Sequence, residues 1–311
     1  MFIKFKKLQS YITISLLIFI LFFSSCNQSS NTTELNLPDG FISKVFVDSI
    51  AETVRHMDVK NNGDLYVKFR RQSDEGVLAA IRDINSDGKA DSIVKFGQYH
   101  IPQQGSYSTG SRIHNGYLYY SSQLTVYRVK LDPQKLVPIS NPEIIVVDDH
   151  EHGSHEHIGK PIAFDDKGYI YVPFGAPNNA CQEPKRTPEA PGLDPCPDLK
   201  LHAGIWRFKS DELNQTQKDG ELFATGLRSI VAMNWNPFDK SLYAVGHGRD
   251  DLARLWPNHY SKWESALLPS EEFIKIEEGD NFGWPYCYYC LLYTSDAADE
   301  GLGVDLGGRR I

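Results

Sequence analysis

The chain repeats one short pattern of apolar and polar positions four times. In each copy an apolar stretch leads into a polar turn with Asn, Asp or Gly, and a short strand rich in tyrosine and aliphatic residues follows. Such turn residues adopt the backbone conformations that a tight hairpin needs, and buried or half-buried strands carry apolar residues in runs or in alternation. The pattern therefore predicts hairpins over residues 57–67, 113–120, 162–172 and 233–245.

One tyrosine in each copy marks the spacing of the repeat. Tyr66, Tyr119, Tyr171 and Tyr243 are separated by about 50 residues twice and then by about 70, and the long interval contains an insertion at 181–197. A period near 50 with several strands per unit is typical of β-propeller blades. We therefore predict an all-β fold, a six-bladed β-propeller in the complete protein, with about four blades present in this chain.

The N-terminal segment differs from the repeat. Residues 1–25 carry lysines near their start and continue into an apolar run at 11–23. This run is short for a membrane span, which needs about 20 apolar residues, and the pattern is typical of a secretion signal. The run ends in a sequence that resembles a bacterial lipobox at Cys26, so we predict lipidation of Cys26 and a polar tether over 26–37. The expected protein is an exported bacterial lipoprotein, periplasmic or anchored to the outer membrane through lipid alone. A plain signal peptide is the alternative.

The C-terminal segment also differs from the repeat. Residues 290–311 resemble the translation of an adapter used in sequencing libraries, and we predict that they are not native. A native glycine-rich tail is the alternative. The partial propeller is accordingly assigned to residues 38–289.

Composition and charge narrow the classes of partner. The net charge is −8 at pH 7, and the chain has no basic stripe, so we expect no nucleic-acid partner. Cys181 and Cys196 bracket the proline-rich insertion, and export favours a disulfide between them. Two unrelated buried thiols are the alternative.

Residues 83–91 indicate a calcium-binding loop. Asp83, Asn85, Asp87 and Asp91 supply oxygen atoms at nearby positions, and a glycine within the loop permits a tight turn, as in an EF-hand. Valine occupies the position where such a hand has its closing Glu. We therefore predict a loop-type calcium site that stiffens the loop, with an ordinary Asp/Gly hairpin as the alternative.

The most specific motifs lie between residues 226 and 287. They are Gly-Leu-Arg-Ser at 226–229, Asn-Trp-Asn-Pro at 234–237, His-Gly-Arg-Asp-Asp at 247–251 and Gly-Asp-Asn-Phe-Gly-Trp-Pro-Tyr-Cys at 279–287. This order resembles the soluble quinoprotein sugar dehydrogenases, the glucose/sorbosone dehydrogenase family. The resemblance implies oxidation of an aldose or related sugar, with pyrroloquinoline quinone (PQQ) and Ca2+ as cofactors and a periplasmic electron acceptor.

The resemblance also implies catalytic roles for individual residues. His157 matches the family's general base, which takes the hydroxyl proton while hydride passes to the quinone, and Glu156 helps to hold the cofactor or orient the ring. Arg228 matches the arginine that contacts the quinone carbonyl, where a fixed guanidinium stabilises developing negative charge. Ser229 stands where the family commonly has Asn and keeps a shorter hydrogen-bond donor. The alternatives are a histidine-rich loop at 150–157 that has no role or binds adventitious metal, and a structural ion pair for Arg228.

Two further groups follow in the motif region. His247, Arg249 and Asp250 come after the fourth tyrosine strand and are assigned as substrate contacts. Glu272 stands about ten residues before Phe282, a spacing like the family's calcium-binding stretch, in which a carboxylate and backbone carbonyls hold the ion. An exposed acidic turn is the alternative for Glu272.

Parts of the family pattern have no match in the chain. Gln103 and Gln104 match the family's early quinone-contacting glutamine poorly, and the late basic residues that bind the cofactor carboxylates would fall beyond residue 289. We therefore expect an enzyme in the full-length protein and an inactive fragment in this chain. Two other classes stay open: a calcium-dependent lactonase or esterase propeller, and a non-catalytic propeller that binds carbohydrate or protein.

Overall fold

The computed structural model describes residues 35–50, 52–99, 110–149, 156–268 and 271–287. Contacts divide the chain into a smaller unit, Met1–Ile50 with Ser86–Lys89, and a larger unit that holds the remainder. Cys26, Gln103, Gln104 and residues 290–311 lie outside the described residues, so the expectations for them stay predictions. The described part of the smaller unit has no helix or strand.

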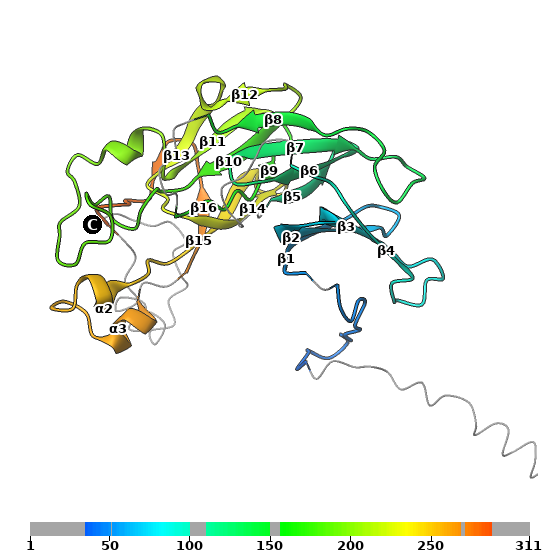
Figure 1. Ribbon diagram of the computed structural model, residues 1–311, viewed down its shortest axis with the longest axis horizontal. Coiled ribbons are helices and arrows are strands. Elements are labelled where there is room, and N and C mark those ends of the chain that lie inside the picture. The colour runs from blue at the N-terminus through cyan, green and yellow to red at the C-terminus, as the bar shows by residue number, and fades with distance from the viewer. Residues whose placement is uncertain (1–34, 51, 100–109, 150–155, 269–270, 288–311) are drawn as a thin grey trace, which may run out of the picture. The chain divides into compact units, whose positions relative to one another are not determined.

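The larger unit contains four β-sheets (Figure 1). The first sheet comprises β1 (Val54–Val59), β2 (Leu65–Ser73), β3 (Gly76–Arg82) and β4 (Ser92–Phe96). The second comprises β5 (Ser111–His114), β6 (Tyr117–Ser121), β7 (Thr125–Lys130), β8 (Glu143–Val147) and β12 (Gln215–Thr216). The third comprises β9 (Ala163–Phe164), β10 (Tyr169–Phe174), β11 (Gly204–Lys209), β13 (Glu221–Thr225) and β17 (Asp280–Asn281), and the fourth β14 (Ile230–Asn236), β15 (Ser241–Gly246) and β16 (Glu272–Ile276).

Each predicted hairpin forms the first two strands of one sheet. These pairs, β1–β2, β5–β6, β9–β10 and β14–β15, are antiparallel. First strands also meet between sheets, because β1 packs on β5 and β9 packs on β14. In addition, Arg112 of β5 donates a hydrogen bond to the carbonyl oxygen of Met233 in β14 at 2.9 Å. The predicted all-β fold with four propeller blades is thus confirmed, while six blades in the complete protein stays a prediction.

Three of the four repeated tyrosines belong to the core. Tyr66, Tyr119 and Tyr171 are at most 2% exposed. A buried phenol needs a hydrogen-bond partner, and each of these hydroxyls has one: Tyr66 donates to the carbonyl oxygen of Leu136 at 2.8 Å, for example. Tyr243 differs because its hydroxyl lies at the surface, where it donates to Asp239 at 2.6 Å. The repeat therefore predicts both strand positions and core positions.

The strands pair in chain order with two exceptions, both short parallel strands. Ala224 and Thr225 of β13 pair with Asp280 and Asn281 of β17, so the chain returns from the fourth sheet to the third. Similarly, β12 adds to the edge of β8 in the second sheet. These returns connect sheets that the hairpin pattern alone would leave independent.

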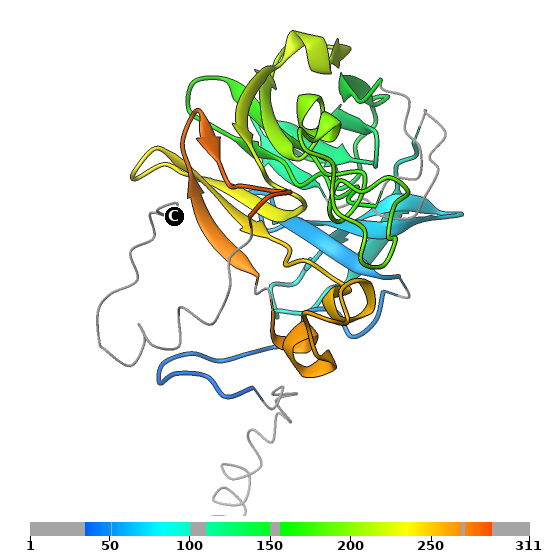
Figure 2. The ribbon, with the colours of Figure 1, turned by 90° about the vertical axis from the view of Figure 1, so that its left-hand side faces the viewer.

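Helices are few and short in the described chain. They are α2 (Leu252–Leu255), α3 (Lys262–Leu267) and the 3-10 turns η1 (Pro197–Lys200) and η2 (Gln217–Asp219). Ser261 caps α3 reciprocally with Glu264. Figure 2 shows α2 and α3 near the loop that precedes η1, and backbone hydrogen bonding from Glu189 to Leu255 at 2.7 Å joins the two segments. No helix among the described residues is long and apolar enough to cross a bilayer.

Candidate functional site

The turn between β13 and β14 places Arg228. Gly226 has a φ of +74°, and a Cβ on it would lie 2.5 Å from atoms of both Asn281 and Gly283. Another residue would therefore be strained and would push these segments apart. Trp284 closes the turn by donating its backbone N–H to the carbonyl oxygen of Gly226 at 3.1 Å. The Gly-Leu-Arg-Ser motif and the Gly-Trp-Pro motif thus come together in space.

Arg228 is buried and surrounded by acceptors. It is 6% exposed, and its Nη1 lies 2.7 Å from both His157 Nε2 and Asn179 Oδ1. Its Nη2 donates to the carbonyl oxygens of His247, at 2.9 Å, and Gly248. The planar guanidinium, with donors in a fixed fork, is held in one orientation by these contacts.

The contacts of His157 define its tautomer. Its Nδ1 lies 2.7 Å from the carbonyl oxygen of Ala176, which can only accept, so Nδ1 carries the hydrogen. Nε2 is then the acceptor that faces Arg228. Burial and, next, the positive charge of Arg228 lower the pKa of His157 to about 4. The imidazole is therefore neutral at pH 7, and Nε2 is its basic atom.

Negative charge near Arg228 lies at the rim of the cluster. Burial lowers the pKa of Arg228, and Asp250, whose carboxylate is 3.7 Å away and half exposed, partly offsets this effect. Glu271 accepts from the backbone N–H of Gly248 at 3.0 Å and lies 3.4 Å from His247 Nδ1. The buried cation is therefore only loosely neutralised, which leaves a positive potential in the cluster.

Several predicted residues line one small cavity of about 60 Å³. It is bordered by Arg228, Ser229, His247, Arg249, Glu272 and Phe282, among others. Burial, followed by the charge of neighbouring Glu271, raises the pKa of Glu272. Within the described chain, the Glu272 carboxylate has no hydrogen-bond or ion-pair partner. The structure thus brings the predicted calcium carboxylate beside the predicted quinone-contacting arginine.

Glu156 lies in a different interaction. Its carboxylate pairs with Arg186 through contacts of 2.8 and 3.0 Å. Arg186 also contacts Asp251, which in turn accepts from Arg254 at 2.8 Å. Glu156 therefore stands next to His157 in the chain but takes part in a separate ion-pair network.

The predicted calcium loop at 83–91 is divided between the two units. In the larger unit, the Asp91 carboxylate accepts from the backbone N–H groups of Ile84, at 2.6 Å, and Asn85, at 3.2 Å. In the smaller unit, Asp87 accepts from the backbone of Lys89 at 2.8 Å. Both carboxylates serve local turns, and calcium binding by Asp83, Asn85, Asp87 and Asp91 stays a prediction.

The insertion contains a disulfide. Cys181 and Cys196 are joined, with an S–S distance of 1.94 Å and Cα atoms 6.0 Å apart. Both sulfurs and Asp198 form a cluster of ligand-type side chains, but sulfurs that are bonded to each other are not thiolate ligands. The free thiol of Cys287 is exposed.

Sequence reasoning missed Asn179. This residue is 2% exposed, its Oδ1 accepts from Arg228, and its carbonyl oxygen accepts from the indole N–H of Trp284 at 2.9 Å. Among the described residues, nothing pairs with its buried Nδ2. The only signal in the sequence was a polar Pro-Asn-Asn at 177–179 between a buried strand and Cys181.

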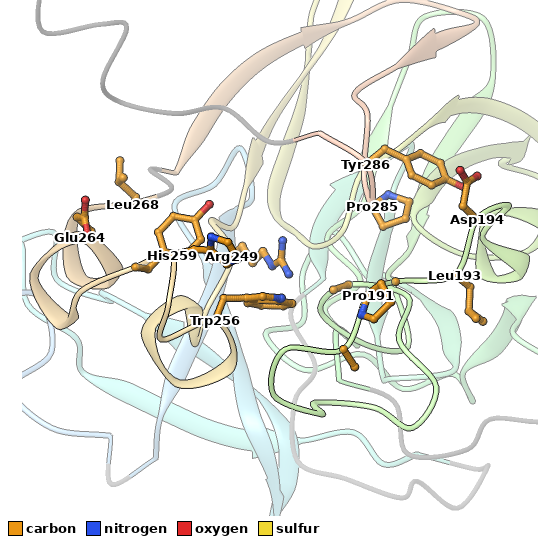
Figure 3. A pocket seen from close by; sticks show the side chains of 14 residues that line it. Pro191, Leu193, Asp194, Arg249, Trp256, His259, Glu264, Leu268, Pro285 and Tyr286 are labelled. Carbon is orange, nitrogen blue, oxygen red and sulfur yellow. The ribbon is translucent and has the colours of Figure 1, made fainter.

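A larger cavity of about 660 Å³ lies beside the cluster (Figure 3). Arg249 and Pro285 border both the large cavity and the small one. The remaining lining comes from the disulfide insertion, from the segment of α2 and α3, and from Tyr286. This cavity was not expected from the sequence, because its walls are loops and short helices without a hydrophobic period.

Comparisons with known proteins agree with this architecture. A family model described as TrAA12-like matches residues 35–305. The iodide structure of the Trichoderma reesei family AA12 enzyme is 17% identical, with a TM-score of 0.61, over 86% of this chain and 62% of that one. Its calcium structure gives 16% identity and a TM-score of 0.62, over 92% and 67%. The apo-form of the soluble aldose sugar dehydrogenase from Escherichia coli gives 15% and 0.50, over 75% and 63%.

At these identities the likeness shows the fold alone. The chain spans 62% of the length of the AA12 iodide structure. No curated protein sequence matches the chain.

Proposed function

The chain belongs to the TrAA12-like family, and on that premise we propose that it is part of a quinone-dependent sugar oxidoreductase. The reaction is oxidation of a hydroxyl group of an aldose or related sugar, with PQQ as oxidant and calcium as a supporting ion. The similar solved structures are the calcium structure of a carbohydrate-active enzyme and an aldose sugar dehydrogenase. These likenesses support a sugar substrate here.

The observation that carries the proposal is the contact between His157 and Arg228. A neutral imidazole nitrogen lies 2.7 Å from a buried guanidinium, so a base and a cation are in direct contact. Oxidation of an alcohol removes a proton from oxygen and a hydride from carbon. His157 can accept the proton, and Arg228 can stabilise the negative charge that develops on an acceptor oxygen.

The residues present fit a quinone. The buried Nδ2 of Asn179 is a donor with no partner among the described residues. The positive charge of Arg228 is offset only in part, by half-exposed Asp250 at 3.7 Å and by Glu271 at the rim. A quinone oxygen accepts hydrogen bonds, so it suits both groups. Arg228 and Asn179, with Ser229 at the cavity wall, would hold it. When bound, PQQ supplies the acceptor for the hydride.

A cation suits the neighbouring carboxylate. Glu272 has a raised pKa because burial and Glu271 disfavour its charged form. Calcium would stabilise that charge, and oxygen ligands are those it prefers. We propose Glu272 as a ligand, with Phe282 contributing a backbone carbonyl from the same cavity wall.

His157 performs the proton step in this proposal. Its Nδ1–H is fixed by Ala176, so Nε2 points into the cluster and accepts the hydroxyl proton. Arg228 occupies the Nε2 lone pair in this structure, so the sugar hydroxyl must take that place when substrate binds. The lowered pKa keeps Nε2 unprotonated at pH 7.

Reconstitution of the complete protein tests the proposal. The purified protein is mixed with PQQ and Ca2+, and dye reduction is followed with a panel of aldoses. We expect dye reduction that requires quinone and sugar and that His157→Ala abolishes. In parallel, PQQ binding to this chain is followed by absorbance, with Arg228→Ala for comparison. Absence of both quinone binding and dye reduction in correctly folded protein contradicts the proposal.

A further inference from the structure

The large cavity has the size of a ligand site. Its volume is about 660 Å³, within the roughly 300–1,000 Å³ of small-molecule pockets. Figure 3 shows that Arg249, Trp256 and His259 lie on one side of it and that Pro191, Pro285 and Tyr286 lie across from them. The side chains that line it come from three separate segments of the larger unit.

Hydrogen bonds tie these three walls together. The disulfide insertion meets the α2–α3 segment where the Glu189 carboxylate accepts from Asn258 Nδ2 at 3.1 Å. The insertion meets the third wall where the backbone N–H of Cys196 donates to the Tyr286 hydroxyl at 2.6 Å. The disulfide then closes the insertion itself. The walls of this open cavity are therefore connected to one another, which holds its shape.

The charges in the walls do not suit an anionic ligand. Arg249 lies over the Trp256 ring, 4.1 Å from its centre, and is the one arginine in the lining. Asp194 and Glu264 carry opposite charge in the same lining. PQQ carries several carboxylates, so this wall would repel it as much as attract it. A neutral ligand is favoured.

The chemistry of the walls suits sugar rings. The aromatic faces of Trp256, Tyr260 and Tyr286 offer apolar area to the C–H face of a pyranose. His259, Asp194 and the guanidinium of Arg249 offer donors and acceptors for hydroxyl groups around it. This mixture of flat apolar surface and polar tips matches a neutral polyhydroxylated ligand.

The cavity also adjoins the proposed reaction centre. Arg249 and Pro285 border both this cavity and the small one that contains Arg228 and Glu272. A single pyranose ring would leave most of the large cavity empty. A sugar whose reacting end lies near Arg228 could extend past Arg249 toward Trp256.

We propose that this large cavity binds the sugar units adjacent to the one that is oxidised, so that the substrate class is an oligosaccharide rather than a free monosaccharide. The statement that one end of the sugar is oxidised rests on the proposed function. The statement that the cavity binds a neutral glycan rests on the geometry of the cavity alone. Trp256 is the central contact, and Arg249 lies between the two cavities.

Calorimetric titration of the full chain without quinone tests this binding site. Glucose, maltose and cellobiose are the probes. We expect at least one disaccharide to bind about tenfold or more tightly than glucose. We expect Trp256→Ala to weaken that binding by about tenfold, because aromatic surface contributes on the order of 1 kcal/mol or more. Trp263→Ala is the matched control, since Trp263 belongs to the adjacent α3, is 72% exposed and lies outside the lining; it leaves affinity unchanged.

A second variant guards against misfolding of Trp256→Ala. His259→Ala removes an exposed side chain from the lining, and we expect weaker disaccharide binding with an unchanged circular dichroism spectrum. Equal affinity for glucose and both disaccharides overturns the inference, as does the absence of measurable binding. Equal effects of Trp256→Ala and Trp263→Ala, or displacement of disaccharide by PQQ, also overturn it.

The two proposals fail separately. Tight disaccharide binding without dye reduction in the complete protein contradicts the proposed redox function and leaves the glycan site intact. Dye reduction with equal preference for glucose and disaccharides, unaffected by Trp256→Ala, contradicts the oligosaccharide site alone.

Discussion

Lys160 and Arg228 are both buried cations, but their surroundings differ. Lys160 is 3% exposed, lies 3.2 Å from the equally buried carboxylate of Asp148, and sits over the Phe174 ring at 4.1 Å. Arg228 is 6% exposed, yet its carboxylate partner Asp250 is 3.7 Å away and half exposed. The first charge is neutralised where it lies, whereas the second is held by neutral acceptors. A compensated cation suits the core, and an uncompensated one is available to a reacting group.

The largest expected effect separates the two cations by stability. Lys160→Met removes the cation beside the buried Asp148 carboxylate, so we expect the free energy of unfolding to fall by about 3–5 kcal/mol. The measurement is chemical denaturation of the full chain. Lys240→Met is the matched control, because Lys240 is an exposed lysine with a weak surface pair at 3.9 Å. Adding Asp148→Leu should restore most of the loss, and equal effects at Lys160 and Lys240 would contradict the assignment.

The second effect separates them by activity. In the quinone-loaded complete protein we expect Arg228→Ala to lower kcat by about 100- to 1,000-fold, because removing one donor to a developing oxyanion costs this much. Arg228→Lys should retain part of the rate, since it keeps the charge without the planar fork. Stopped-flow dye reduction is the measurement. If Lys160→Met lowers the kcat of folded protein as strongly, the distinction between the cations is wrong.

The disulfide gives a third, somewhat smaller effect. Cys181 and Cys196 are 15 residues apart, so replacing both with Ser should lower the free energy of unfolding by about 3 kcal/mol. We also expect weaker PQQ binding, because Asn179 lies close to the disulfide in the chain and holds Arg228. Thermal unfolding and quinone titration measure the two losses. Cys287→Ser, at an exposed free thiol, is the control for stability and should leave thermal unfolding unchanged.

The smallest effect is a shift in a titration. Burial and Arg228 hold the pKa of His157 at about 4, below its usual 6.5. The unfolded chain therefore binds more protons between these values, so this residue's contribution to stability is present above pH 6.5 and is lost as pH falls toward 4. Arg228→Met should raise the pKa, which NMR titration of the imidazole measures. Lys240→Met should leave it unchanged, and a value near 6.5 in the unmodified chain would refute this account.

The sequence predicted the parts of the molecule that depend on local chemistry. Asn, Asp and Gly at hairpin turns and tyrosines at strand centres act within a few residues, so the four hairpins could be located. Arg228 and Glu272 could be singled out because they stand in short motifs, and the structure brings both to one cavity. The parts that depend on distant pairing were not accessible.

Glu156 and Asn179 illustrate which contacts a single sequence does not predict. Glu156 finds Arg186, which is 30 residues away, inside an insertion whose path is set by a disulfide. Asn179 accepts a hydrogen bond from Arg228, which is 49 residues away, although no motif on either side of Asn179 indicates this contact. In both cases the partner is selected by loop packing, and a single sequence carries no periodic signal for a loop.

The return of β17 to β13 has a consequence for the order of folding. The third sheet obtains its last strand from residues made only after the whole fourth sheet, so its edge stays open while that sheet is being synthesised. An open edge is a site for wrong pairing, and a late, long-range closure is slow. Trp284, which bonds Gly226, completes the closure. We therefore expect the third and fourth sheets to fold as one cooperative unit, and the nascent chain to stay prone to aggregation until both sheets have formed.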